Sequence, residues 1–307
     1  MQPLSDRLKQ SGVLLADGAM GTMLFRRGLL PGDCPEKLNL ERPEIIEEIA
    51  GLYVRAGAEI IQTNTFGGSP LKLEPYGLDG QTEEINIRAL QCVRGVVGDR
   101  AYVSGACGPS GKIREPYGDT SPEAVFESFK RQMQALIAGG IDMICIATMT
   151  DLAEATLAIK AARSISSEVP ICATMTFDST PRGFYTVMGT NIEQAAKGLT
   201  EAGADIIGSN CGNGIQNMIA IARQFKRHST LPIIIQSNAG IPTLVNGVLA
   251  YPESPEFMAD KALELLRLGV KIIGGCCGTT PGHIAAMKKA VEEFTKSEPH
   301  PRNNLDS

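Results

Sequence analysis

Two adjacent cysteines, Cys276 and Cys277, stand between glycines in the stretch IIGGCCGTTPGH, residues 272–283. A third, Cys211, ends another apolar run, ADIIGSNC at 204–211. Thiolate sulfur is a preferred ligand of Zn²⁺, which binds four groups tetrahedrally and keeps one position open at catalytic sites. Neighbouring glycines let consecutive side chains face one ion, which the alternating pleat of a strand would prevent. The three cysteines are therefore candidate zinc ligands at a site that accepts a substrate.

The composition of the chain excludes several classes of binding partner for such a site. The chain has 307 residues and a formal net charge of −5, so it offers no basic surface for nucleic acid or acidic membranes. No apolar run reaches the roughly 18 residues that span a bilayer, and the start, MQPLSDRLKQ, lacks the apolar core of a signal peptide. We therefore expect a cytoplasmic protein that binds small molecules.

The remaining cysteines and the histidines further restrict the kinds of metal site and catalytic site that the chain could form. Eight cysteines in a reducing cytosol are expected to be thiols rather than disulfides. Four of them suit the apolar core: Cys92, Cys107, Cys145 and Cys172. The chain has three histidines, which argues against a histidine metal site or a Ser-His-Asp triad.

The elements that must position the three thiols can be predicted from the hydrophobic pattern. Short runs that are apolar throughout are typical of parallel strands buried on both faces. Eight such runs occur, at 13–20, 58–66, 101–108, 142–149, 170–177, 204–211, 232–240 and 270–277. Between them lie amphipathic helical stretches that begin near a proline and end on a glycine, at 42–57, 121–140 and 254–269.

Eight strands that alternate with helices, with no linker between them, predict an α/β chain folded as a single (β/α)₈ barrel. We place this barrel at residues 1–294 and a solvated tail at residues 295–307. A doubly wound sheet is the alternative, but chain length, strand number and strand spacing agree better with a barrel.

In such barrels the active groups lie at the carboxyl ends of the strands. The sixth and eighth strands are two positions apart, so Cys211 can face the cysteine pair across the barrel mouth. Other polar residues end strands one, two and seven, namely Asp17, Asn64, Thr65 and Asn238.

Several motifs occur in the order that a known family shows them. They are DGAMGTML (17–24), TNTFGG (63–68), GPSG (108–111), MTFD (175–178), NC (210–211), NAG (238–240) and GGCCGTTPGH (274–283). Over roughly residues 12–292 the chain resembles the homocysteine S-methyltransferase family. The resemblance is to the homocysteine-binding module of cobalamin-dependent methionine synthase in particular, and also to betaine–homocysteine methyltransferase.

The resemblance implies a (β/α)₈ barrel in which Cys211, Cys276 and Cys277 hold zinc. It also implies that Asn238 occupies the fourth position until a thiol substrate displaces it. A zinc-bound thiol is deprotonated yet still nucleophilic, so it can attack an electrophilic methyl group. The residues expected near the amino acid substrate are Asp17, Gly18, Asn64, Thr65 and Thr148. The alternative for the first four residues is that they only form the turns that end their strands.

One departure concerns the substrate. After the fourth strand the family usually carries Glu-Thr, with the glutamate placed to meet the ammonium group of homocysteine, whereas this chain has Ala147 and Thr148. The lost charge-assisted contact is worth about 1.5–3 kcal/mol. Asp151 is a candidate to replace it; alternatively, the acceptor is a different thiol.

The aromatic content of the chain indicates which methyl donor it could bind. The chain has no Trp and 5% aromatic residues, which argues against betaine or S-methylmethionine, because aromatic faces usually hold such cations. Methylcobalamin on a separate corrinoid protein fits better.

Two other classes of protein stay open. The stretch GVKIIGG (269–275) resembles the phosphate sites of barrel aldolases and isomerases, although no lysine stands at a strand end as a Schiff-base candidate. A non-catalytic zinc or redox-sensing barrel would have four permanent protein ligands.

Overall fold

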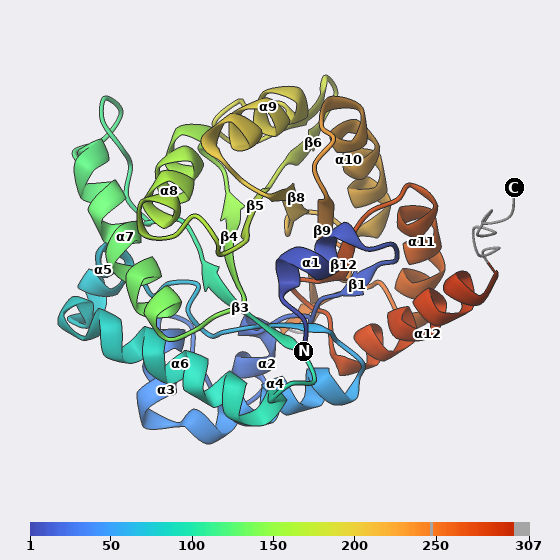
Figure 1. Cartoon of the computed structure of the whole chain (residues 1–307), viewed down its shortest axis with the longest axis horizontal. Helices are drawn as coiled ribbons and strands as arrows, with labels where there is room; N and C mark the ends of the chain where they lie inside the picture. Colours follow the sequence, from blue (N-terminus) through green and yellow to red (C-terminus); the bar gives the residue numbers. More distant parts are fainter. Residues whose placement is uncertain (246–247, 298–307) are drawn as a thin grey trace, which may run out of the picture.

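The computed structural model describes residues 1–245 and 248–297 and shows a (β/α)₈ barrel (Figure 1). Eight parallel strands follow the order β1-β12-β9-β8-β5-β4-β3-β2, and a bridge between Ala16 and Ile60 joins the two ends of the sheet. The strands are β1 (Leu14–Leu15), β2 (Ile60–Gln62), β3 (Tyr102–Cys107), β4 (Met143–Met149), β5 (Ile171–Met175), β8 (Ile206–Asn210), β9 (Ile233–Ser237) and β12 (Ile272–Gly275). Each lies within one of the eight predicted runs.

Helices surround the ring of strands (Figure 1). The main ones are α4 (Pro43–Arg55), α6 (Thr82–Val97), α7 (Pro122–Ala138), α8 (Leu152–Ile165), α9 (Ile192–Ala202), α10 (Ile215–His228), α11 (Pro255–Arg267) and α12 (Pro281–Ser297). Shorter ones are α1 (Leu4–Lys9), α2 (Gly21–Phe25), α3 (Leu38–Glu41) and α5 (Pro70–Leu73), with 3-10 turns at Pro35–Lys37, Glu74–Tyr76 and Asp79–Gln81. Helices α7 and α11 have typical N-caps, because Ser121 and Ser254 accept hydrogen bonds from backbone N–H groups of the first turn.

The core has two layers, as strands buried on both faces require. Outside the strands, a large apolar cluster fills the space beneath the helices and includes Cys92 and Cys107. Inside the barrel, a smaller cluster includes Cys145 and Cys172, and Leu4 of α1 joins it. All four of these cysteines are buried, as predicted. Helix α1 thereby closes the amino-terminal end of the barrel, which leaves the carboxyl end as the open mouth.

Two hairpins at the mouth were not predicted: β6 (Asp178–Thr180) with β7 (Gly183–Tyr185), and β10 (Thr243–Val245) with β11 (Val248–Ala250). The expected tail at 295–307 needs a correction, because α12 continues to Ser297; residues 298–307 lie outside the described residues. No helix among the described residues is both long and apolar enough to cross a bilayer.

Close strand packing around Gly208 gives a first testable prediction. A Cβ at this position in β8 would overlap the carbonyl oxygen of Ile234 in the adjacent strand β9. Neither backbone can move away without breaking the barrel ladder, so we expect Gly208→Ala to lower the free energy of unfolding by about 3 kcal/mol or more. Urea denaturation measures this loss.

The control for this prediction is Gly21→Ala. Gly21 begins α2, and a Cβ added there would have no heavy atom within 4 Å apart from its chain neighbours and the backbone of its own helix. Alanine should therefore be tolerated or slightly stabilising at this position. Equal stability of the two variants would contradict the packing argument.

Candidate metal centre and substrate cavity

The three candidate zinc ligands meet at the carboxyl end of the barrel. Cys211 follows β8, the cysteine pair follows β12, and β9 lies between these strands. Among the described residues they form the sole cluster of three or more His, Cys, Asp or Glu side chains that could hold a metal, with sulfurs within 4.8 Å of one another. Cys211 Sγ is 3.8 Å from Cys277 Sγ. Tetrahedral bonds of about 2.3 Å separate the sulfurs of a zinc site by about 3.8 Å, so the spacing fits Zn²⁺.

Backbone hydrogen bonds between neighbouring loops orient the loops that carry the three cysteines. The Cys276 N–H donates to the Ser237 carbonyl at 2.7 Å, and the Ala239 N–H donates to the Cys277 carbonyl at 3.0 Å. Cys211 has a φ of 60°, a left-handed conformation that a non-glycine residue adopts at a cost. Such strain, held in place by surrounding contacts, is typical of functional sites.

The thiols share negative charge unevenly. Hydrogen bonds from Cys276 and Cys277 lower the pKa of the Cys211 thiol. The same contacts raise the pKa of Cys276 and of Cys277, because the charge on Cys211 disfavours a second thiolate beside it. A divalent cation would remove this penalty and let all three sulfurs ionise.

Asn238, predicted as the fourth ligand, lies beside the cysteines. Its side chain is buried and contributes to lowering the pKa of the Cys211 thiol. The Asn238 Oδ1 atom has no hydrogen-bond partner among the residues that the structure describes. Because a buried, unpaired polar oxygen is costly unless something binds it, this atom suits a cation ligand.

A cavity of about 370 Å³ opens beside the cysteines. Three of the predicted substrate residues line it: Gly18, Asn64 and Thr148. Ala147 also lines it, as do the three cysteines. Further lining residues had no predicted role, among them Glu36, Gln62, Thr63, Phe66, Asn210 and Gln236.

Asp17 precedes Gly18 in the chain but is itself absent from the residues that line the cavity. Its Oδ2 accepts a hydrogen bond from the Gln62 N–H at 2.8 Å, while its buried Oδ1 has no partner within the described part of the chain. Burial raises the pKa of this carboxyl to about 7. An unpaired carboxylate oxygen one residue away from the cavity lining is a candidate partner for a cationic group of a ligand.

Thr65 is not brought to the cavity. Its hydroxyl donates to the Ala106 carbonyl at 2.7 Å and lies 2.6 Å from the Thr63 hydroxyl. The side chain is fully buried in the barrel wall, and Thr63 lines the cavity instead. The Asn64 amide donates to the carbonyl of Pro35 and to Asn39, so it anchors the loop that forms this wall.

Thr148 reaches the cavity through an irregularity in β4. The register between β4 and β5 shifts between Ile146 and Met149, and Thr148 has a φ of 62°. The Asn210 side chain accepts from the Thr148 N–H and donates to the Thr148 hydroxyl, both at 2.8 Å. Asn210 Nδ2 also lies 3.9 Å from Cys276 Sγ, so one amide connects Thr148 to the sulfur cluster.

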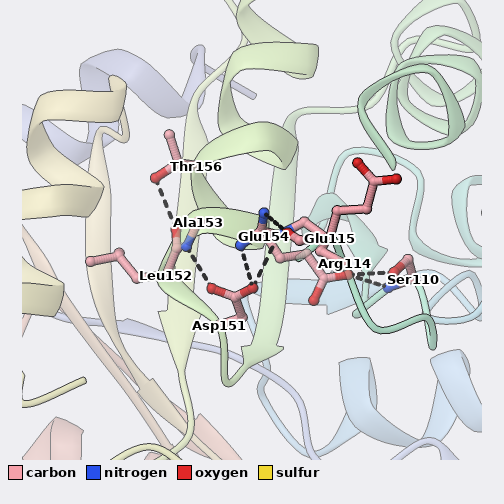
Figure 2. Close-up of polar contacts among 8 residues, drawn as sticks. All are labelled: Ser110, Arg114, Glu115, Asp151, Leu152, Ala153, Glu154 and Thr156. Atoms are coloured by element: carbon pink, nitrogen blue, oxygen red, sulfur yellow. Dashed lines mark hydrogen bonds and ion pairs between the residues drawn. The ribbon is translucent and has the colours of Figure 1, made fainter. Parts of the chain in front are cut away.

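Asp151, one of the two alternatives for the missing glutamate, does not line the cavity. Asp151 is the N-cap of α8, and its Oδ2 accepts two hydrogen bonds from Arg114, at 2.9 Å and 3.1 Å (Figure 2). Glu154, nearby in α8, accepts from the backbone and hydroxyl of Ser110 (Figure 2). Because helix capping and the arginine use both carboxylate oxygens, Asp151 stabilises the mouth loops and is absent from the cavity lining.

This arrangement gives a second prediction. Asp151→Asn keeps the helix cap but loses the partly buried ion pair, so we expect it to lower the free energy of unfolding by up to about 1 kcal/mol. We expect the KM for the acceptor thiol to be unchanged, as measured in steady-state assays. A rise of about tenfold, equivalent to 1.4 kcal/mol, would show that Asp151 does contact the substrate.

Glu36 and Tyr251 are among the residues of this region that sequence reasoning missed. Glu36 lies in a 3-10 turn, is 4% exposed, and accepts a hydrogen bond from the Gly67 N–H at 2.6 Å. Burial raises its pKa. Tyr251 follows β11, and a Cβ at Gly278 would overlap its ring. Burial raises the pKa of the Tyr251 hydroxyl to about 12, and the nearby cysteine thiolates add to this shift. Neither residue stands at the end of a barrel strand, where such a site is sought from sequence.

Comparisons with known proteins agree with this geometry. A model of the family described as Homocysteine S-methyltransferase matches residues 14–291. Methionine synthase from Mycobacterium tuberculosis (strain ATCC 25618 / H37Rv) is 30% identical, over 96% of this chain and 26% of that protein. Methionine synthase from Mycobacterium leprae (strain TN) is also 30% identical, over 91% of this chain and 24% of that protein. The chain thus spans about a quarter of the length of these curated relatives.

Solved structures show the same fold. The oxidized form of the homocysteine methyltransferase MmuM from Escherichia coli superposes with a TM-score of 0.76 and 26% identity, covering 94% of this chain and 99% of that one. The metallated form superposes with a TM-score of 0.78 and 24% identity over the same shares of the two chains.

Proposed function

This chain belongs to the homocysteine S-methyltransferase family, and on this basis we propose that it is a zinc-dependent enzyme that transfers a methyl group to the sulfur of homocysteine, giving methionine. The observation that carries the proposal is the convergence of three cysteine sulfurs, within 4.8 Å of one another, on the wall of a cavity. Three permanent sulfur ligands leave one tetrahedral position for the substrate.

Each residue of the centre has a distinct task in this proposal. Cys211, Cys276 and Cys277 would hold the metal, and Asn238 would supply a fourth ligand in the absence of substrate. Bound zinc supplies a Lewis acid that keeps the substrate sulfur deprotonated at neutral pH. Asp17 receives the substrate ammonium, since its Oδ1 is buried and has no partner among the described residues.

Homocysteine remains the preferred acceptor although Ala147 replaces the family glutamate. With Ala147 in the wall, the cavity keeps one unpaired carboxylate oxygen nearby, that of Asp17, and adds the polar groups of Thr148 and Gln236. A different amino thiol is the alternative acceptor, because the space left by the missing side chain could admit a larger group.

For the donor we propose a methylated corrinoid carried by a separate protein. Of the aromatic side chains that the structure describes, Phe66 alone lines the cavity, so no aromatic cage surrounds a small methyl cation such as betaine or S-methylmethionine. The segments that follow the barrel strands expose large apolar side chains, including Phe25 of α2, Ile113, Val187 and Leu244 of β10. Exposed apolar groups around an active-site mouth are typical of a surface that docks another protein.

The proposal is tested with the zinc-loaded protein. X-ray absorption at the zinc edge should show three sulfurs plus one lighter ligand, changing to four sulfurs when homocysteine is added. Adding methylcobalamin should then yield methionine and the absorbance of cob(I)alamin. Turnover with betaine or S-methylmethionine instead would correct the donor. Zinc whose coordination does not respond to any thiol would favour the non-catalytic barrel.

A further inference from the structure

Two glutamines from non-adjacent strands lie at the inner end of the cavity. Side chains alternate between the two faces of a strand. Ile60 of β2 and Ile234 of β9 belong to the apolar cluster inside the barrel, so Gln62 and Gln236, two residues further along these strands, also face inward. Both glutamines line the cavity, and Gln236 is 2% exposed. The inside of the barrel therefore changes from apolar to polar at the level of these two amides.

The two amides meet across the space above β12. In the ring of strands, β1 and β12 separate β2 from β9. Gly274 of β12 lies in register with Gln236 and has no side chain to fill the space between the glutamines. The Gln62 Nε2 donates to the Gln236 Oε1 at 3.4 Å. Because this bond is long, either amide can turn toward a ligand at little cost.

These glutamines have N–H groups that no protein group uses. Each carboxamide has two N–H donors, and neither side chain forms another hydrogen bond within the described part of the chain. The other two amides of the lining are occupied. Asn64 Nδ2 donates to a backbone carbonyl and to another amide, and Asn210 Nδ2 donates to the Thr148 hydroxyl and lies 3.9 Å from a cysteine sulfur.

The charge of the lining indicates which ligand group these donors suit. None of the described residues that line the cavity is Lys, Arg or His, so an anionic group of a ligand must be held by neutral donors. Asp17 lies beside the glutamines, because its Oδ2 accepts from the Gln62 backbone N–H at 2.8 Å. An amino acid carries its ammonium and carboxylate groups on one carbon. A site for it needs an acceptor such as Asp17 and anion-binding donors close together.

We propose that Gln236 is a specificity-determining residue whose side-chain amide, oriented by Gln62, donates a hydrogen bond to the carboxylate of the acceptor thiol. The inference rests on the proposed function and deepens it, since the acceptor must then carry a carboxylate as well as a thiol. The Gln236 carbonyl accepts from the Cys211 N–H at 3.1 Å, so this residue lies against a loop of the candidate metal centre. A site built to hydrogen-bond one substrate group discriminates against analogues that lack it.

The test measures the binding of three thiols to zinc-loaded protein by calorimetric titration. They are homocysteine, 4-mercaptobutyrate, which lacks the amino group, and 3-aminopropane-1-thiol, which lacks the carboxylate. Gln236→Met removes the amide but keeps an unbranched side chain of similar length. We expect this variant to bind homocysteine and 4-mercaptobutyrate about 10- to 150-fold more weakly and 3-aminopropane-1-thiol as the wild type does. The matched control is Gln134→Met, at an exposed position of α7, which should match the wild type for all three thiols.

The wild type alone supplies a second readout, which does not depend on how a variant folds. It should bind homocysteine at least about tenfold more tightly than 3-aminopropane-1-thiol. Equal wild-type affinity for these two thiols would overturn the inference, and so would a Gln236→Met variant that changes the affinity for all three thiols equally or not at all. The proposed function would stand in either case. A wild type that binds none of the thiols would refute the proposed function and the inference with it.

Discussion

Replacing Cys277 by serine is expected to abolish zinc binding and methyl transfer together. Serine is nearly isosteric, so the loop around Gly278 should keep its shape, but a neutral hydroxyl is a far poorer zinc ligand than a thiolate. The loss in zinc affinity should exceed the roughly 100-fold upper range for a partner that only supports a ligand. Elemental analysis and chelator competition on reduced protein measure it.

Cys92→Ala is the matched control for this result. Cys92 is a buried thiol in α6 and belongs to the apolar layer outside the strands, so it is no part of the sulfur cluster. This variant should lose some stability, as a small cavity would cause, and should keep one zinc per chain. Retention of wild-type zinc affinity in Cys277→Ser would show that the sulfur cluster is not the metal site.

Asp17→Asn is expected to raise the KM for homocysteine by about 10- to 150-fold, which corresponds to the 1.5–3 kcal/mol of a charge-assisted hydrogen bond. The variant keeps the shape of the side chain but removes the charge from the unpaired Oδ1. Zinc affinity should stay unchanged. The compound 4-mercaptobutyrate, which is homocysteine without its amino group, should bind the wild type and the variant equally.

The same substitution has a pH signature. Because burial raises the pKa of Asp17 to about 7, the carboxylate is fully charged only above that pH, and the wild type should bind homocysteine more weakly as the pH falls through 7. The raised pKa also means that the native state holds this proton more tightly than the unfolded chain does. Its contribution to stability is therefore lost as the pH rises from about 4 to about 7.

Binding and unfolding measurements across this range separate the roles of Asp17. In the wild type, homocysteine binding should depend more strongly on pH than 4-mercaptobutyrate binding, and Asp17→Asn should lose this difference. The free energy of unfolding of the variant should also decline less between pH 4 and pH 7 than that of the wild type. If the variant weakened binding of both thiols equally, Asp17 would act through the shape of the cavity and not through the substrate ammonium.

The barrel and the three thiols at its mouth could be predicted from residue types and spacing alone. Both depend on local patterns: runs such as 204–211 and 270–277 are apolar throughout, and parallel strands place their carboxyl ends at one edge. Once the strand count was known, the placement of Cys211 opposite Cys276 followed from barrel geometry. The four cysteines expected in the core followed from their places in apolar runs and helix faces.

The rest of the cavity depends on contacts that form only when the chain is folded. At the register shift in β4, Thr148 has a positive φ and its N–H donates to the side chain of Asn210, which is 62 residues away in the chain. Asp151 turned to Arg114 rather than to the cavity, because a helix began at the next residue and an arginine from another loop lay within reach. The ring of Tyr251 packs against Gly278 from a loop that no strand end marks. Such side-chain directions are set by contacts between distant segments, which residue types and spacing do not encode locally.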